Sequence, residues 1–114
     1  MLKNADIWIR DPFVVSVPEE GRYYLYGTRG AETWGGRATG FDGYRSADLE
    51  NWEGPFVVFR PAADFWSDRQ YWAPEVHRYR GRYYLFATFK AEGVCRGTQV
   101  LVADGPGGPF VPHR

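Results

Sequence analysis

The stretch GRYYLYGT at residues 21–28 decides the fold, because it returns almost unchanged as GRYYLFAT at residues 81–88. In each copy apolar and aromatic residues occupy both alternating sets of positions, which is typical of a β-strand covered on both faces. A second phrase, GPFV, follows the copies at residues 54–57 and 108–111. A repeat of this length, built from short aromatic strands and turns, indicates the blades of a β-propeller.

Turn-forming residues divide each copy into short strands. In the first copy we expect strands at residues 13–17, 22–28, 41–46 and 55–59, and in the second at residues 73–79, 82–89, 98–103 and from residue 110. Four such strands make one blade. The predicted fold class is therefore all-β, a partial propeller of about two four-stranded antiparallel blades. Blade 1 spans about residues 7–60, a linker about 61–71, and blade 2 about 72–114.

Two blades are too few to close a propeller, which takes roughly four to eight. We therefore expect residues 1–114 to be the N-terminal portion of one propeller domain, with an incomplete second blade. The remaining blades of the same parent chain would complete it. Oligomerisation is the alternative route to closure.

The composition excludes several classes of function. Lys and Arg balance Asp and Glu at 14 each, so no net charge favours nucleic acid or an anionic membrane. No apolar run is long enough to span a bilayer, and the single Cys95 cannot form an intrachain disulfide. The N-terminus lacks the apolar core of a signal peptide. A cytoplasmic location is the default expectation, and secretion is left open.

A carboxylate lies beside a proline upstream of each repeated strand, Asp11 before Pro12 and Glu75 after Pro74. We interpret the two as equivalent positions on neighbouring inner strands, from which they would converge on one cavity. Converging carboxylates with aromatic neighbours suit cleavage of a glycosidic bond. Trp72 would supply either an apolar face for a sugar ring or packing between blades.

Two further residues are candidates for binding. Asp42, in the third strand, would either line the cavity or be solvated. Trp34 lies in a glycine-rich loop at residues 29–40, and long loops on rigid β scaffolds often carry function. Trp34 would cap a sugar subsite or pack the rim. His77 and His113 form no metal-ligand spacing with any carboxylate, so no metal is assigned.

The ordered motifs resemble glycoside hydrolase family 43 over about residues 7–114. The resemblance rests on the two GRYYL strands together with RDPFV at residues 10–14, SADLENW at 46–52, WAPEV at 72–76 and ADGPGGPF at 103–110. It implies a five-bladed propeller of inverting enzymes that act mostly on arabinosides and xylosides in plant-type polysaccharides or oligosaccharides. It also implies a carbohydrate substrate and no cofactor. Some members hold calcium in the central channel, but its ligands do not map onto this sequence.

The resemblance also implies roles for individual residues. Asp11 matches the general base that activates water. Trp72 and Glu75 match the segment that borders the sugar subsite, so Glu75 is expected in substrate binding or electrostatic support. The family's acid and its acidity-tuning aspartate lie on later blades, beyond residue 114. We therefore expect the 114-residue chain alone to be inactive.

Two alternatives to this function stay open. One is a propeller that binds carbohydrate or another protein without catalysis. The other is a related fructosidase-type enzyme in which the first-blade aspartate is a nucleophile and configuration is retained. The Asn-Asp-Pro opening expected there is absent, because Arg10 precedes Asp11.

Overall fold

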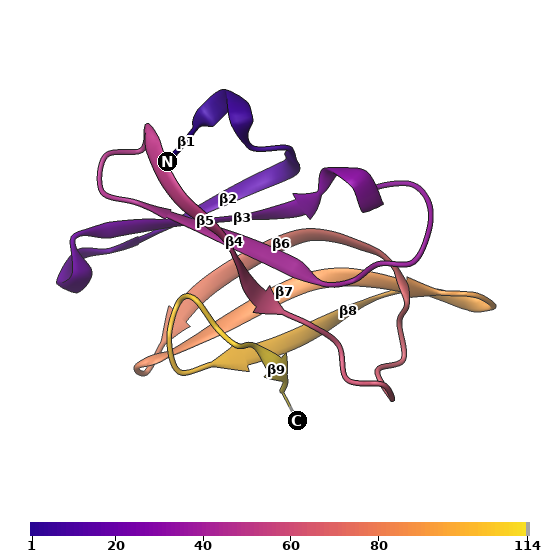
Figure 1. The fold of residues 1–114 in the computed structure, drawn as a ribbon. Helices are drawn as coiled ribbons and strands as arrows, with labels where there is room; N and C mark the ends of the chain where they lie inside the picture. Colours follow the sequence, from indigo (N-terminus) through magenta and orange to yellow (C-terminus); the bar gives the residue numbers. More distant parts are fainter. Residues whose placement is uncertain (114) are drawn as a thin grey trace.

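The computed structural model of the protein describes residues 1–113 and contains two antiparallel β-sheets that pack face to face (Figure 1). The first has the strand order β1 (Leu2–Lys3), β5 (Asn51–Phe59), β4 (Phe41–Ser46), β3 (Arg22–Arg29), β2 (Ile9–Val17). The second has the order β6 (Arg69–Tyr79), β7 (Arg82–Ala91), β8 (Val94–Ala103), β9 (Val111–Pro112). Three short 3-10 turns, η1 (Asn4–Asp6), η2 (Pro18–Glu20) and η3 (Gly30–Glu32), complete the described elements.

The all-β prediction of two antiparallel blades is confirmed, although several strands begin earlier than expected, β2 at Ile9, β5 at Asn51 and β8 at Val94. The first sheet has a fifth strand, because β1 pairs with the start of β5. The second blade begins earlier than expected, since β6 starts at Arg69, inside the segment predicted as a linker. No helix among the described residues is long and apolar enough to cross a membrane.

The repeated phrase forms the second strand of each sheet, and each copy is preceded by a tight turn. Between β2 and β3, η2 ends at Gly21, whose φ of 64° lies in the left-handed region that glycine adopts without strain. Between β6 and β7, Arg80 and Gly81 both have positive φ, as a two-residue hairpin turn requires. These turns fix the register, so Val17 pairs with Arg22 just as Tyr79 pairs with Arg82.

Each inner strand bulges at its proline, and this corrects the expected equivalence of Asp11 and Glu75. The ladder shifts between Arg10 and Phe13 in β2 and between Trp72 and Glu75 in β6. Asp11 and Ala73, each directly before a proline, share a φ of 52°. Phe13 pairs with Tyr26, and Glu75 with Phe86 at the matching position of the repeat. Asp11 is therefore equivalent to Ala73, because the bulge is positioned by the proline and not by the carboxylate.

An aromatic cluster joins the two sheets. Phe89 of β7 is fully buried, and its ring centre lies 4.9 Å from that of Tyr71, 6.1 Å from Phe41 and 6.3 Å from Phe59. Phe65 closes the cluster at 5.3 Å from Phe89. Most of these pairs are edge-on, the geometry that aromatic quadrupoles favour. The cluster draws on β4 and β5 of one sheet and β6 and β7 of the other, so it holds the blades together.

Tyr71, in this cluster, makes stability sensitive to alkaline pH. Its hydroxyl donates to the carbonyl of Ser67 at 2.7 Å, and burial raises the pKa of Tyr71 from 10.0 to about 12. The unfolded chain therefore loses this proton at a lower pH than the folded chain does. The contribution of Tyr71 to the free energy of unfolding is fully present below pH 10 and is lost as the pH rises toward 12.

We expect the free energy of unfolding to fall over this pH range, and to fall less steeply in Tyr71→Phe. Burial also raises the pKa of Tyr26, which adds a decline of the same sign. Denaturant titrations at several pH values measure both slopes. Tyr79→Phe, at an exposed tyrosine, is the control. An identical slope in wild type and Tyr71→Phe would contradict the assignment.

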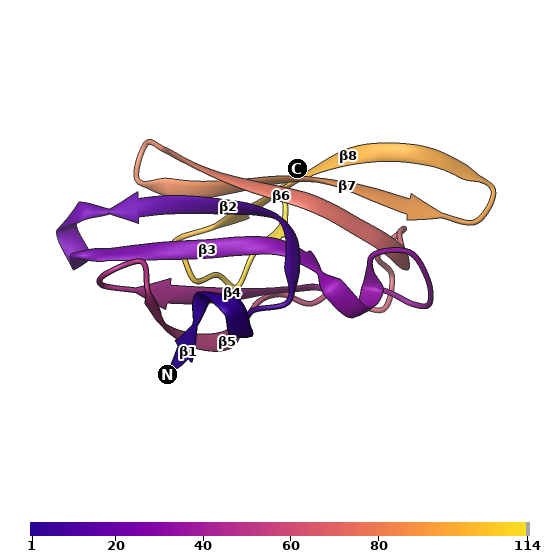
Figure 2. The ribbon, with the colours of Figure 1, turned by 90° about the horizontal axis from the view of Figure 1, so that it is seen from above.

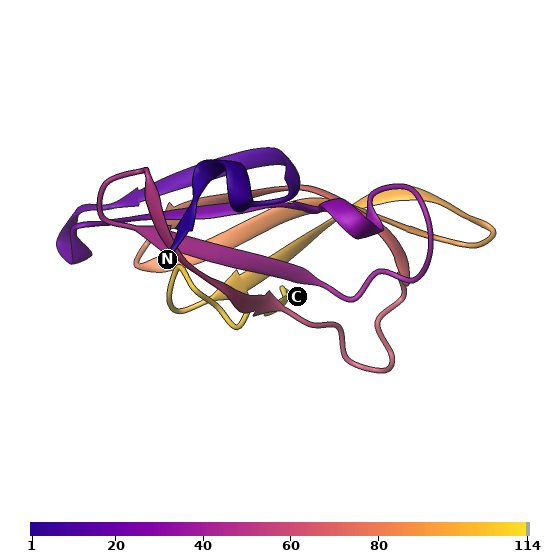
Figure 3. The same cartoon turned by 45° about the horizontal axis from the view of Figure 1, so that its top comes forward.

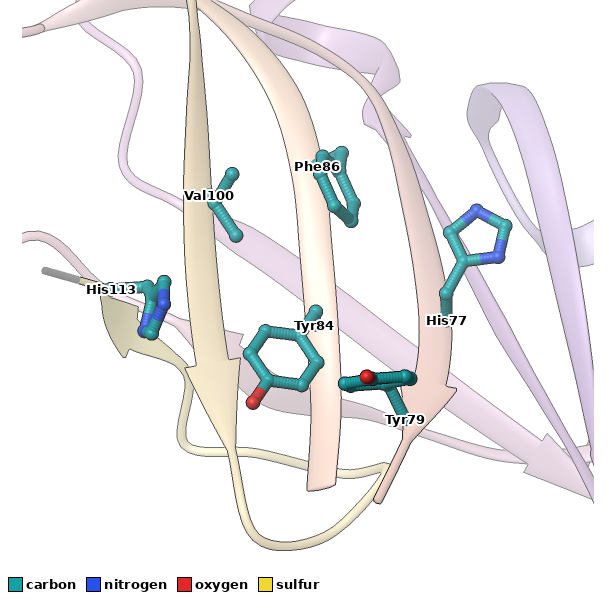
Figure 4. Close-up of a pocket in the computed structure, with 6 residues that line it drawn as sticks. All are labelled: His77, Tyr79, Tyr84, Phe86, Val100 and His113. Atoms are coloured by element: carbon teal, nitrogen blue, oxygen red, sulfur yellow. The ribbon is translucent and has the colours of Figure 1, made fainter. Parts of the chain in front are cut away.

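The outward face of the second sheet is apolar and uncovered among residues 1–113. Figure 4 shows the side chains that stand on it, His77, Tyr79, Tyr84, Phe86, Val100 and His113. Tyr79 is 59% exposed and Phe86 42%. An exposed apolar patch of this kind marks a contact surface.

Candidate active site

The site is built where the inner strands of the two sheets begin. β2 and β6 pack side by side (Figure 2). The loop after β3 and the hairpin between β7 and β8 extend at this same end (Figure 3). This end therefore carries the two proline bulges and the glycine-rich loop.

Asp11 sits in the first bulge with an unengaged carboxylate. The side chain is exposed, and within residues 1–113 it forms no hydrogen bond or ion pair. Its φ of 52° is one that Asp tolerates better than most residues. Pro12 disfavours a helical conformation at this position. The backbone thus presents a carboxylate that can act as a base or hydrogen-bond acceptor.

Thr28 brings the two bulges together. It lies on β3 opposite Arg10 and is 1% exposed. Its hydroxyl oxygen accepts a hydrogen bond of 2.8 Å from the backbone N–H of Ala73. Asp11 follows Arg10 and Trp72 precedes Ala73, so this bond holds the two predicted site residues at one end of the blades. Thr28 was not among the residues predicted for the site, although it closes the repeated phrase.

The structure also brings Trp34 and Trp72 together. Their ring centres lie 5.3 Å apart at an interplanar angle of 75°, and the indole N–H of Trp72 donates to the carbonyl of Thr33 at 2.7 Å. Trp34 is 68% exposed, whereas Trp72 is half-buried. The guanidinium carbon of Arg10 lies 5.9 Å from the ring centre of Trp34. Trp34 is therefore the member of the pair with open ring surface.

Arg96, which sequence reasoning did not single out, covers one face of Trp72. Its guanidinium carbon lies 3.7 Å from the indole centre. It also donates to the carbonyl of Gln70 at 3.0 Å and to the hydroxyl of Thr88 at 3.3 Å. Partial burial lowers the pKa of Arg96. These contacts hold Trp72 in place and leave it less ring surface for a sugar than Trp34 has.

We expect Arg96→Lys to loosen this pair, because lysine keeps the charge but lacks the planar fork that stacks and donates at once. The loss should amount to about 1–2 kcal/mol of unfolding free energy, the scale of one cation–π contact with a hydrogen bond. Denaturant unfolding and the far-UV circular dichroism of the coupled indoles measure it. Arg82→Lys, at an exposed ion pair, is the matched control. An unchanged indole signal would contradict the role of Arg96.

Glu75 lies on β6 three residues after Trp72, and its partner on the strand is His77. Its carboxylate is 3.3 Å from the imidazole of His77, and both side chains are more than half exposed. Within the described residues no hydrogen bond or ion pair joins Glu75 to Asp11, Trp34 or Trp72. Relative to the bulges, Glu75 therefore stands two residues further along its strand than Asp11 does.

The carboxylate of Asp42 forms ion pairs with two arginines. Its two oxygens lie 3.0 Å from Arg29 and 2.7 Å from Arg60, and its side chain is 15% exposed. Arg29 also contacts Glu32 at 3.1 Å, and Glu32 accepts hydrogen bonds from the N–H and hydroxyl of Thr39. This network ties the two ends of the glycine-rich loop. Asp42 thus supports the loop that carries Trp34, and no contact turns it toward Asp11.

Metal ligands do not gather in the described part of the chain. In residues 1–113, no three His, Cys, Asp or Glu side chains lie close enough to hold an ion. Cys95 is exposed.

Comparison with solved structures gives close matches. An endo-arabinase from Bacteroides thetaiotaomicron VPI-5482 is 38% identical, with a TM-score of 0.85 over 98% of this chain and 37% of that one. A thermostable family-43 glycoside hydrolase is 27% identical, with a TM-score of 0.79 over 100% and 36%. The RS223 β-xylosidase, at 21% identity, shares the fold with a TM-score of 0.78 over 94% and 36%.

This chain therefore spans about a third of the length of these enzymes. A search of curated protein sequences gave no significant match. The family model of the Glycosyl hydrolases family 43 matches residues 7–114, nearly the whole sequence. With the repeated blades, the Asp-Pro bulge and these neighbours, the chain belongs to glycosyl hydrolase family 43.

Proposed function

We propose that this chain is the N-terminal part of a glycosidase that hydrolyses arabinosides or xylosides with inversion, using Asp11 as general base. The observation that carries the proposal is the position of Asp11, an unengaged carboxylate in a bulge whose neighbouring residue Arg10 reaches Trp34 and pairs with Thr28, the partner of Ala73. Family membership supports hydrolysis of a glycosidic bond. Identity to an endo-arabinase supports an arabinose-containing substrate.

In this mechanism a water molecule lies between Asp11 and the anomeric carbon. The Asp11 carboxylate takes a proton from this water as the water oxygen attacks the anomeric carbon. The bond between that carbon and the leaving oxygen breaks at the same time. An acid on the opposite side of the sugar protonates that oxygen. Base and acid stand roughly 6.5–9.5 Å apart in inverting enzymes, which leaves room for the water.

We assign the acid to further blades of a longer chain. The same blades would cover the apolar outward face of the second sheet (Figure 4). Trp34 would stack on the apolar face of a sugar ring, because its ring is open. Trp72 would hold Trp34 in position through their ring contact. Glu75 would bind substrate or add negative charge near the cavity.

The test is hydrolysis of aryl arabinofuranosides and aryl xylosides by the full-length protein, with the anomeric product followed by NMR. Turnover with inverted product supports the proposal. Turnover with retained configuration would make Asp11 a nucleophile instead of a base. Sugar binding without turnover would favour a non-catalytic carbohydrate-binding propeller.

A further inference from the structure

We propose that Trp8 is a platform for a second sugar residue, next to the one at Asp11; this rests on the proposed glycosidase function. Trp8 is 70% exposed, as open as any aromatic side chain in the described chain. Its side chain forms no hydrogen bond or aromatic pair within residues 1–113. The indole therefore has no core-packing role that would explain it.

The indole is nevertheless held in place, because it lies flat on Gly30. A Cβ added to Gly30 would lie 2.3 Å from the indole nitrogen and 2.4 Å from Cδ1 and from Cε2. Nearly equal distances to three atoms of the five-membered ring put that position over the ring face. The glycine backbone thus supports one face of the indole, and the exposure belongs to the opposite face and the edges.

Backbone pairing fixes this platform beside the candidate site. The N–H of Gly30 donates to the carbonyl of Trp8 at 3.2 Å, and Ile9 pairs with Arg29. Trp8 therefore stands where β3 enters the glycine-rich loop, three residues before Asp11. Arg10, two residues on, reaches Trp34 in the same loop. Trp8 and Arg10 thus contact the same loop, Trp8 at Gly30 and Arg10 at Trp34, at the end that carries Asp11.

The chemistry of this surface fits a sugar in a chain. A supported indole with one open face offers a flat apolar area, onto which the C–H face of a pyranose or furanose ring stacks. Trp66 makes the contrast clear, since its N–H donates to Gln99 and its ring packs on Phe65 and Phe89. The expected ligand at Trp8 is a neutral glycosyl residue of an oligosaccharide whose neighbour lies at Asp11.

The test is calorimetric binding of linear arabino-oligosaccharides and xylo-oligosaccharides to the full-length protein, in an Asp11→Asn background that prevents turnover. Adding Trp8→Ala should weaken binding of the longer oligosaccharides about tenfold, the effect of losing roughly one stacked ring. The loss should be much smaller for the monosaccharide. Val57→Ala, at an exposed apolar side chain of β5 that belongs neither to the candidate site nor to the uncovered face of the second sheet, is the control.

Gly30→Ala provides a second, independent variant, because the added methyl group must displace the indole. It should weaken the same oligosaccharides, and it should add no further loss to Trp8→Ala. Should Trp8→Ala fold poorly, Trp8→Tyr keeps a flat ring and should bind with intermediate affinity.

Equal losses for monosaccharide and oligosaccharide, or no loss, would overturn the inference. So would a lowered melting temperature without a change in binding, which would mean that Trp8 packs against another part of the protein. Failure of the proposed function is distinguishable. In that case Asp11→Asn would still turn over substrate, or wild type would hydrolyse none, whatever the effect of Trp8→Ala on binding.

Discussion

Asp11→Asn in the full-length protein is expected to lower hydrolysis of aryl arabinofuranosides or xylosides by about 10²–10⁴-fold, the contribution of a general base. The amide cannot accept the proton of the attacking water. Asparagine has the size of aspartate and also tolerates a left-handed backbone, so the bulge at φ 52° should survive. Because the side chain is exposed and unengaged in the described structure, the fold should lose little stability. Initial rates at saturating and at low substrate measure the effect.

The control for this substitution is Asp104→Asn, which makes the same change at an aspartate on the far side of the molecule. Asp104 is exposed, and its carboxylate pairs with Arg82 at 3.1 Å. We expect its turnover to match that of wild type. Near-normal turnover in Asp11→Asn, with an unchanged melting temperature, would remove Asp11 from the mechanism and leave the family fold without this assignment.

Phe89→Ala is expected to cost about 3–5 kcal/mol of unfolding free energy, as large aromatic truncations in buried cores do. Phe89 is 0% exposed and contacts rings from both sheets, including Phe41 and Phe59. Its loss leaves a cavity between the blades that rigid strands cannot close. Denaturant unfolding of the 114-residue chain measures the change.

Phe86→Ala is the matched control, since Phe86 lies on the same strand and points to the opposite face. It is 42% exposed in this chain, so the cost should be within about 1 kcal/mol. Equal costs for the two substitutions would contradict the placement of the core between the two sheets.

The fold was largely predictable because its signals are local. Alternating aromatic residues and turns at Gly21 and Gly81 specify hairpins within a few residues of chain. The repeat then indicates that two such units stack. The strand missed at residues 2–3 carries no such signal, because two residues are too few to show an alternating pattern.

The candidate site was only partly predictable. Asp11 stood out through its proline and its resemblance to a family motif, but its equivalence to Glu75 was wrong. The prediction matched the two carboxylates because each lies beside a proline. The strand register instead matches Pro12 with Pro74, so that Asp11 corresponds to Ala73. Thr28 and Arg96 were missed because each acts on a residue far along the chain, at Ala73 and Trp72.

The sequence by itself determined that this protein is made of two propeller-type blades and that Asp11 lies near the start of the first inner strand. Periodicity, proline and glycine act within single hairpins, so these features need no tertiary information. The tertiary structure decided which side chains meet: Trp34 with Trp72, Asp42 with two arginines, and Trp8 with Gly30. These contacts depend on how the two twisted sheets stack and on the bulge that shifts the register. Neither can be predicted from a single segment of the sequence.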